Sequence, residues 1–247
     1  MNRRTFVTTS SLAALGTLFV KCSGSSTILL KKNQVIACLG DSVTYAGKDG
    51  YVERLQKYTD TNCPQLNLKF LNWGKNSETI TGLTEEDHPG PRPYLFNRLD
   101  GLLNATDVDV IFFCFGINCG IYGKPSPQLF DSYKIGIYSF LEKIKLKKIQ
   151  AVLLTPPPLA LKAVPLKKLP AATPFSWKNP YPLYEEEVLQ EFKKIVLEVK
   201  HSNLLGTIDI HTPLLKNQTE LYTDDPIHPN PKGHELIAGT VIDHLRF

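Results

Sequence analysis

The run Val35-Ile36-Ala37-Cys38-Leu39, followed directly by Gly40-Asp41-Ser42, decides the fold class of this chain. Five consecutive apolar residues without polar alternation are typical of a strand that is covered on both faces, as in parallel sheets. Four further strands are expected, at residues 68–72, 110–115, 151–154 and 207–210. Segments with helical periodicity separate and follow them, at residues 51–58, 94–103, 128–147, 184–200 and 232–245.

Strand and helix thus alternate five times, which predicts a doubly wound three-layer α/β/α sandwich around a five-stranded parallel sheet. The 247 residues suit a single domain, expected at residues 27–247, preceded by an export signal and tether at residues 1–26. In folds of this class, binding and chemistry take place beyond the carboxyl ends of the strands. The segments that follow the strands are therefore the ones in which functional residues are expected.

Composition narrows the function classes. The chain is 42% hydrophobic and 21% charged with a net charge of +4, as in ordinary soluble domains. Its lysines are scattered, and it has neither a basic arm nor zinc-finger spacing, so nucleic acid is not an expected partner. The histidines other than His228 show no metal-ligand spacing, and no cofactor or metal is expected. A monomer is expected.

The N-terminus has the features of an export signal. Arg3-Arg4 precedes an apolar stretch at residues 10–20, which is too short for a permanent membrane-spanning helix. This is typical of twin-arginine signals and predicts an exported protein, located in the periplasm, in the envelope or outside the cell. Cys22 and the polar tether after it resemble a lipoprotein signal, which would make Cys22 a lipid anchor. Lys21 departs from that pattern, because a small residue is usual there.

The remaining cysteines show no Cys-x-x-Cys spacing, so neither a zinc ribbon nor a redox site is expected. Cys38 and Cys114 lie in apolar runs, where a thiol acts as a small buried hydrophobe. A disulfide from Cys63 stays open.

Polar residues follow three of the strands. Ser42 follows the first strand, where Gly40 allows a sharp turn that leaves the serine exposed. Gly74 follows the second strand and can present a backbone N–H. Asn118 follows the third strand, where its amide can donate to an oxyanion or form an Asx-turn.

Near the C-terminus, Asp225 stands three residues before His228, so that the carboxylate can orient the imidazole while the imidazole reaches a serine. Asn230 followed by Pro231 is typical of a helix start and predicts that this loop is fixed directly before the last helix. A second Asp/His pair, Asp209 and His211, is expected inside the fifth strand in a structural role.

The order and content of these four blocks resemble the SGNH hydrolases, also called the GDSL esterase/lipase family, over residues 35–245. The resemblance implies a flavodoxin-like sandwich of the SGNH type, with Ser42 as nucleophile, His228 as general base and Asp225 as its orienting carboxylate. It further implies an oxyanion hole made by the N–H groups of Ser42 and Gly74 and by the side chain of Asn118. An aspartate usually follows that asparagine, whereas this chain has Cys119.

Three function classes stay open. The first is a serine esterase that removes acetyl groups from carbohydrates, favoured by the expected export and by the aromatic residues in the proline-rich segment 156–182, which is expected to form a substrate-facing flap. The second is a lipase, lysophospholipase or thioesterase, which needs an apolar acyl groove. The third is a catalytically silent glycan-binding module on the same fold, against which the intact Ser42, Asp225 and His228 stand.

Overall fold

The computed structural model describes residues 27–247, and the expected export signal and tether lie outside the described residues. A five-stranded, all-parallel sheet forms the centre, in the order β3-β2-β4-β5-β6. Its strands are β2 (Val35–Gly40), β3 (Lys69–Gly74), β4 (Val110–Cys114), β5 (Gln150–Leu154) and β6 (Leu204–Ile208). The predicted fold class is therefore confirmed, and the fifth strand begins and ends earlier than expected.

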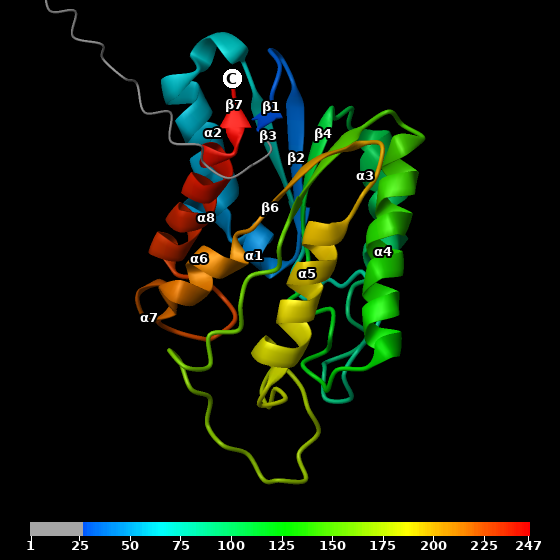
Figure 1. Cartoon of the computed structure of the whole chain (residues 1–247), viewed down its shortest axis with the longest axis vertical. Helices are drawn as coiled ribbons and strands as arrows, with labels where there is room; N and C mark the ends of the chain where they lie inside the picture. The colour runs from blue at the N-terminus through cyan, green and yellow to red at the C-terminus, as the bar shows by residue number, and fades with distance from the viewer. Residues whose placement is uncertain (1–26) are drawn as a thin grey trace, which may run out of the picture.

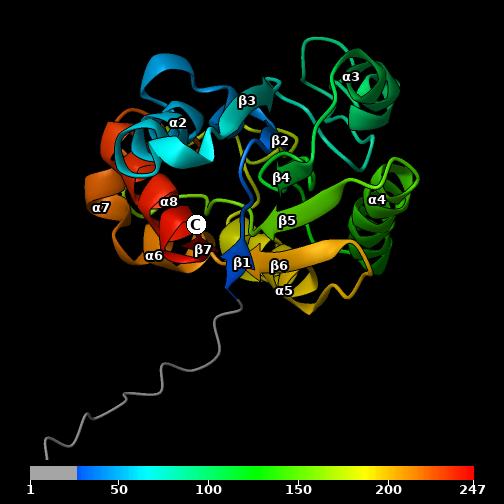
Figure 2. The same ribbon diagram turned by 90° about the horizontal axis from the view of Figure 1, so that it is seen from above.

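Helices cover both faces of the sheet (Figure 1, Figure 2). One layer consists of α2 (Tyr51–Asn62), α6 (His211–Lys216), α7 (Gln218–Leu221) and α8 (Pro231–Asp243). The other consists of α3 (Leu99–Ala105), α4 (Pro127–Lys145) and α5 (Gln190–Glu198), the last of which continues a π-helical segment, Tyr184–Leu189.

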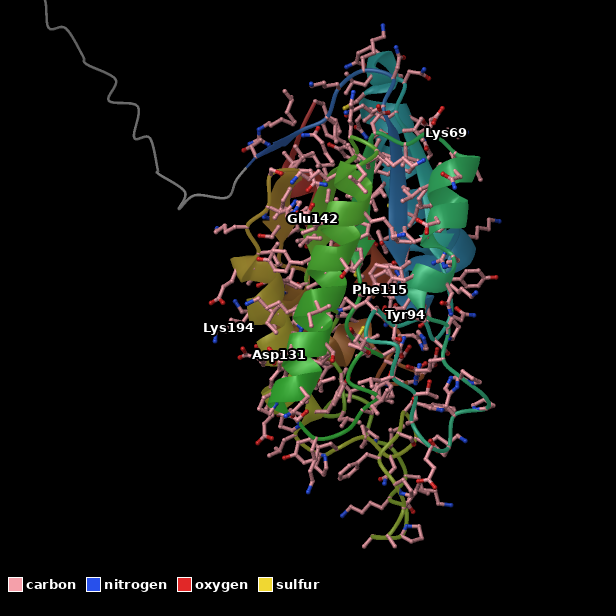
Figure 3. All side chains as sticks on the ribbon, turned by 90° about the vertical axis from the view of Figure 1, so that its right-hand side faces the viewer. Lys69, Tyr94, Phe115, Asp131, Glu142 and Lys194 are labelled. Carbon is pink, nitrogen blue, oxygen red and sulfur yellow. The ribbon has the colours of Figure 1, made fainter. Side chains whose placement is uncertain are left out.

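The strands are apolar throughout because each side of the sheet has its own core. Ile36 and Cys38 pack into the core beneath α2 and α8, whereas Ala37 and Leu39 pack into the core beneath α3, α4 and α5. Figure 3 looks onto α4 and α5, with charged residues such as Glu142 and Lys194 on the outside and Phe115, which is fully buried, labelled beside α4. The two cores fix the register of the strands, since a slip of one residue would exchange their faces.

The carboxyl ends of the strands meet at one edge. The short helix α1 (Ser42–Tyr45) starts directly after β2, and Gly40 pairs with Gly74 of β3 and with Cys114 of β4. At the opposite end of the sheet, β1 (Ile28–Leu29) pairs in parallel with β7 (Leu245–Arg246), so the first and last strands of the described domain lie side by side (Figure 1). Within residues 27–247, no helix has both the length and the apolar character needed to cross a membrane.

Candidate active site

Ser42 is the first residue of α1, and the sequence before it explains its position. The Asp41 side chain caps the helix, because its Oδ1 accepts a hydrogen bond from Val43 N–H at 3.0 Å. Gly40 is required for close packing, since a Cβ there would lie 2.1 Å from Thr44 Oγ1 and 2.6 Å from the carbonyl oxygen of Cys114. The first turn of α1 is thereby fixed against β4, with the Ser42 side chain at the sheet edge.

The Asp225 loop brings the imidazole to this serine. His228 Nε2 lies 2.8 Å from Ser42 Oγ, and His228 Nδ1 lies 2.9 Å from Asp225 Oδ2. Asp225 Oδ1 also accepts the backbone N–H groups of Ile227 and His228, each at 2.7 Å. The structure thus brings together the serine, histidine and aspartate, although 186 positions separate Ser42 from His228.

The predicted start of the last helix accounts for the rigidity of this loop. Asn230 Oδ1 accepts the N–H groups of Lys232 and Gly233, and Pro231 is the first residue of α8, as predicted. The Asn230 side chain also donates to the carbonyl oxygen of Glu220 at 2.8 Å. The loop that carries His228 is therefore fixed on its C-terminal side.

The charges of the Asp225–His228 pair favour a basic imidazole. The hydrogen bond that His228 donates to Asp225 raises the pKa of His228 above its ordinary value, outweighing the effect of burial, and the charges of Asp225 and Asp41 add to it. Burial works against the charged form of Asp225, but the hydrogen bonds and charge of His228 and two backbone N–H groups outweigh it and lower that pKa. Asp225 is thus an anion that holds Nδ1–H and leaves Nε2 to accept the serine proton.

The side chain of Asn118 is held through its oxygen, and its amide nitrogen is left unpaired. Its Oδ1 accepts the hydroxyl of Tyr122 at 2.9 Å, whereas its Nδ2 is buried without a hydrogen-bond partner in residues 27–247. Since buried polar groups are normally paired, an unpaired amide beside a nucleophile is poised for a ligand atom. Tyr122 was not predicted from the sequence, because its role depends on the contact of its hydroxyl with Asn118.

Gly74 occupies the expected position but its N–H is engaged. That N–H donates to Asn72 Oδ1 at 3.0 Å, within the end of the same strand, so it is not free for an oxyanion. Ser77, three residues later, has a left-handed backbone (φ 62°), borders the same cavity as Ser42 and Asn118, and has no hydrogen bond on its N–H within the described chain. The turn residues Asn76-Ser77 were the signal for it in the sequence.

Cys119 is part of the core. It is fully buried, and burial raises the pKa of its thiol to about 12, so it stays protonated at neutral pH. The thiol therefore lacks the anionic character of a nucleophile. Among the cysteines of residues 27–247, Cys63, for which a disulfide stayed open, forms none, and neither do Cys38 and Cys114.

Two cavities flank Ser42 and His228. The Tyr45 cavity, of about 720 Å³, is lined by Tyr45, Asp49, Asn72, Gly74 and His234, among others. The Trp177 cavity, of about 350 Å³, is lined by Asn118, Tyr122, Ser77, Arg92 and Trp177, among others. An ester whose carbonyl carbon lies at Ser42 can therefore extend one part into each cavity.

The proline-rich segment reaches this site. Trp177 lines the Trp177 cavity and, with Leu166, Leu169 and Ile227, an adjoining apolar groove of about 320 Å³ beside His228. The neighbouring Ser176 hydroxyl donates to Asp87 Oδ2 at 3.0 Å and so connects the segment to the loop on the other side. The segment thus contributes side chains to the wall beside His228.

The second Asp/His pair lies elsewhere and differs from the expectation in one respect. β6 ends at Ile208, so Asp209 follows the strand and His211 begins α6 instead of lying in the strand. The strand ends early because Thr155 Oγ1 accepts the N–H groups of Ile210 and His211. His211 is buried against Glu185, at 2.8 Å, in a structural role. In the part of the chain that the structure describes, no group of three His, Cys, Asp or Glu side chains could hold a metal ion.

Comparisons with known proteins bear on the family and the fold. The model of the GDSL-like lipase/acylhydrolase family matches residues 38–236. No curated protein matches the chain significantly.

Among solved structures, the chain is similar to the acetylxylan esterase Axe2 from Geobacillus stearothermophilus, with 18% identity, a TM-score of 0.61, and coverage of 87% of this chain and 94% of that one. LAE5, an α/β hydrolase enzyme from the metagenome of Lake Arreo, has 16% identity, a TM-score of 0.61, and coverage of 87% and 96%. BT4096, a gut microbial diltiazem-metabolizing enzyme, has 19% identity and a TM-score of 0.64, and the match covers 90% of this chain and 49% of that one.

The structural matches share the fold, and the family model spans most of the chain, including the segments that carry Ser42, Asn118, Asp225 and His228. The chain therefore belongs to the GDSL-like lipase/acylhydrolase (SGNH hydrolase) family and is a hydrolase that acts on ester bonds.

Proposed function

We propose that this chain is a carbohydrate O-acetylesterase in which Ser42, His228 and Asp225 form the catalytic triad. The observation that carries the catalytic assignment is the continuous hydrogen-bond chain from Ser42 Oγ through the imidazole to Asp225, at 2.8 and 2.9 Å. A serine hydroxyl becomes an effective nucleophile when a base within hydrogen-bond distance removes its proton. No other Asp/His pair in the described residues reaches a serine in this way.

In the first half-reaction, Ser42 Oγ forms a bond to the ester carbonyl carbon as its proton passes to His228 Nε2. The carbonyl oxygen becomes an oxyanion. When the intermediate collapses, the bond to the alcohol oxygen breaks and His228 returns the proton to that oxygen, leaving an acyl group on Ser42. In the second half-reaction, water attacks the acyl carbon as His228 Nε2 takes its proton. The bond to Ser42 Oγ then breaks, His228 returns the proton to Ser42 Oγ, and the carboxylic acid is released.

The oxyanion needs donors that are fixed before the reaction. The N–H of Ser42 at the first position of α1 and the unpaired Nδ2 of Asn118 fill this role. For the third donor we assign the N–H of Ser77 in place of Gly74, because the Gly74 N–H already donates to Asn72.

The carbohydrate substrate rests on the character of the Tyr45 cavity and on the structural neighbours. The cavity combines an exposed aromatic ring, Tyr45, with polar side chains from Asp49, Asn72 and Asn76, a combination that suits a sugar. Axe2, which shares the fold, is an acetylxylan esterase. When the sugar, which is the alcohol part of the ester, lies in this cavity, the small acyl group lies near the Trp177 cavity.

One observation favours a second candidate. The groove lined by Leu166, Leu169, Trp177 and Ile227 is apolar and adjoins His228, and such a groove suits a longer acyl chain, as in a lipase or thioesterase. Under this alternative, acyl chains of about six or more carbons would be the best substrates.

A substrate panel with a nucleophile control tests these assignments. The purified wild type and the variants Ser42→Ala and His228→Ala are assayed on acetylated xylosides and on nitrophenyl esters of graded chain length. We expect both variants to be folded and nearly inactive, and the wild type to favour the acetylated sugars. Wild-type turnover by Ser42→Ala would refute the triad, whereas a preference for long acyl chains would leave the triad in place and replace the substrate class.

We also propose that the chain is exported by the twin-arginine route, supported by Arg3-Arg4 and the apolar stretch that follows them. Replacing both arginines by lysine should retain the protein inside the cell. Unchanged export would exclude this route. Labelling with a fatty acid tests lipidation of Cys22, and absence of label would mean that the mature protein has no lipid at that cysteine.

A further inference from the structure

The Tyr45 cavity contains a buried histidine that has no role in the triad. His234 is the fourth residue of α8, is 5% exposed, and lines this cavity together with Ser42 and His228. Its ring stacks on Tyr51, with ring centroids 6.5 Å apart and planes inclined by 13°. The imidazole is therefore fixed in orientation by the α2 side of the core.

The hydrogen-bonding state of His234 is unusual for a buried histidine. Its Nδ1 is fully buried without a partner, and its Nε2 makes no hydrogen bond to any residue in the described range 27–247. His211, which is also buried, pairs Nδ1 with the carbonyl oxygen of Pro156 and Nε2 with Glu185. Because Nδ1 is fully buried, a molecule in the Tyr45 cavity can reach only Nε2 of this ring, and a hydrogen bond to Nε2 would recover part of the free energy that an unpaired imidazole costs.

The charge state of His234 limits what it can bind. Burial lowers its pKa to about 4, and the positive charges of Arg54 and His228 contribute, so the imidazole is neutral at the pH of an esterase reaction. A neutral imidazole has one N–H donor and one acceptor nitrogen. A hydroxyl group, which both donates and accepts, can pair with Nε2 in either tautomer of the ring, whereas an anion would find no positive charge on it.

The Tyr45 cavity also lies where the alcohol part of a reacting ester is expected. The unpaired Asn118 amide and Ser77 lie on the Trp177 cavity, which places the oxyanion on that side of Ser42. The opposite and larger cavity, where His234 lies, is then left for the alcohol part. It borders His228, which must return a proton to the alcohol oxygen.

We propose that the Tyr45 cavity is the subsite for the alcohol part of the substrate and that His234 is a specificity-determining residue that forms a hydrogen bond with a second, free hydroxyl of that alcohol. The enzyme then selects esters of polyhydroxylated alcohols over esters of plain alcohols of the same size. This proposal rests on the proposed esterase function and adds to it the group that recognises the substrate.

The experiment compares two acetate esters that differ in free hydroxyl groups, a monoacetylated methyl xyloside and cyclohexyl acetate. His234→Phe removes both nitrogens and keeps a ring over Tyr51. We expect kcat/KM for the sugar ester to fall about tenfold or more, because the hydroxyl loses a partner, and kcat/KM for cyclohexyl acetate to stay within about threefold. His234→Gln should restore part of the difference. His244→Phe, at the end of the same helix and outside the cavity, is the matched control and should change neither.

An equal loss on both esters at unchanged fold, or no loss on the sugar ester, would overturn the assignment of His234. A wild type that accepts no sugar ester would instead count against the proposed function. The two test substrates are then replaced by the 2-hydroxyethyl and ethyl esters of the acid that the enzyme accepts. In that pair, His234→Phe must still remove a preference for the hydroxylated alcohol. If there is no such preference to remove, the inference fails.

Discussion

At the residue scale, the protonation of His228 controls activity. Only the neutral imidazole can take the serine proton, so kcat/KM should fall as pH decreases through the pKa of His228 in the free enzyme. Since Asp225 raises this pKa above the ordinary 6.5, the acid limb should lie above that value. Asp225→Asn should shift the limb to lower pH and reduce kcat by about 10⁴-fold.

A pH–rate profile of kcat/KM measures both effects. Asp209→Asn is the matched control, because Asp209 also stands close to a histidine in sequence but bonds to Thr155 and Thr212. Its acid limb should coincide with that of the wild type. A limb that stays in place in Asp225→Asn would show that another group sets the pKa.

Tyr122 acts on the reaction through Asn118. Without its hydroxyl, Asn118 Oδ1 loses the bond at 2.9 Å that orients the amide. We expect Tyr122→Phe to lower kcat about tenfold with little change in KM, since the contact with the oxyanion strengthens only as charge develops, and Asn118→Ala to lower kcat about 100-fold or more.

A double-mutant cycle distinguishes positioning from mere stability. Combining Tyr122→Phe with Asn118→Ala should be no worse than Asn118→Ala alone. Tyr133→Phe removes a comparable buried hydroxyl, which bonds to the carbonyl oxygen of Phe115 at 2.7 Å, and serves as the control. Additive losses in the double variant would contradict the positioning role of Tyr122.

The residues that sequence alone could reveal are those whose chemistry is carried by their own type and neighbours. Ser42, Asp225 and His228 belong to this group, because a serine after a strand and a carboxylate near an imidazole indicate their function directly. Gly74 is different, since the side chain that engages its N–H belongs to Asn72 and its direction depends on the strand end. Tyr122 and His234 required the packed structure, because their partners or cavities are assembled from distant segments.

At the scale of elements, α1 and β3 are in close contact at Gly74. A Cβ at this position would lie 2.2 Å from the backbone nitrogen of Tyr45 and 2.6 Å from its Cα. Because backbone atoms cannot move aside like a flexible side chain, α1 would shift and carry Ser42 with it. We expect Gly74→Ala to lower kcat more than 10-fold and to reduce stability by about 1–3 kcal/mol.

Gly101→Ala is the matched control. Gly101 lies within α3 with nothing within 4 Å of a Cβ, and alanine favours the helix by about 1 kcal/mol. Urea unfolding and the ester assay on both variants give the comparison. Full activity in Gly74→Ala would mean that the α1 turn tolerates the displacement.

The elements themselves were largely predictable. The apolar runs 35–39 and 110–115 are too short and too uniformly apolar for an amphipathic helix, which favours buried strands. β2 and β4 lie there. β6 lies earlier than expected because its register follows β5, with Leu204 opposite Ala151, and this pairing is not encoded in the local sequence. The four-residue α1 was not expected, because four residues are too few to show helical periodicity. It is stabilised by the Asp41 cap and by packing against β3.

At the scale of the whole molecule, one buried ion pair connects the loop before α3 with the site. Arg92 and Glu85 form two hydrogen bonds of 2.5 Å, with side chains that are 2% and 1% exposed. Arg92 also donates to the carbonyl oxygen of Ser77 at 3.2 Å and lies over the ring of Tyr122. The pair thereby supports Ser77 and Tyr122, two residues assigned to the oxyanion region.

Removing one partner should be costly. Arg92→Met leaves a buried carboxylate unpaired, and we expect a loss of about 3–5 kcal/mol in the free energy of unfolding. The double variant Arg92→Met/Glu85→Leu should recover much of this loss, because no charge is left buried. Urea unfolding measures both.

The Lys143–Asp100 pair is the control, since its side chains are 34% and 65% exposed. Asp100→Asn should cost at most about 1 kcal/mol, as is usual for exposed pairs. Equal effects of the buried and exposed substitutions would show that burial does not govern the strength of the Arg92 pair.

The pairing of β1 with β7 has a consequence for how this enzyme can be attached to a surface. Ile28 lies opposite Leu245, so both ends of the described domain leave it together, at the end of the sheet that points away from α1 (Figure 1). A molecule immobilised through either end, on a resin or on a biological surface, would present Ser42 outward. Its catalytic edge would stay open to bulky, insoluble polymers, and attachment chemistry at either end should leave the turnover rate unchanged.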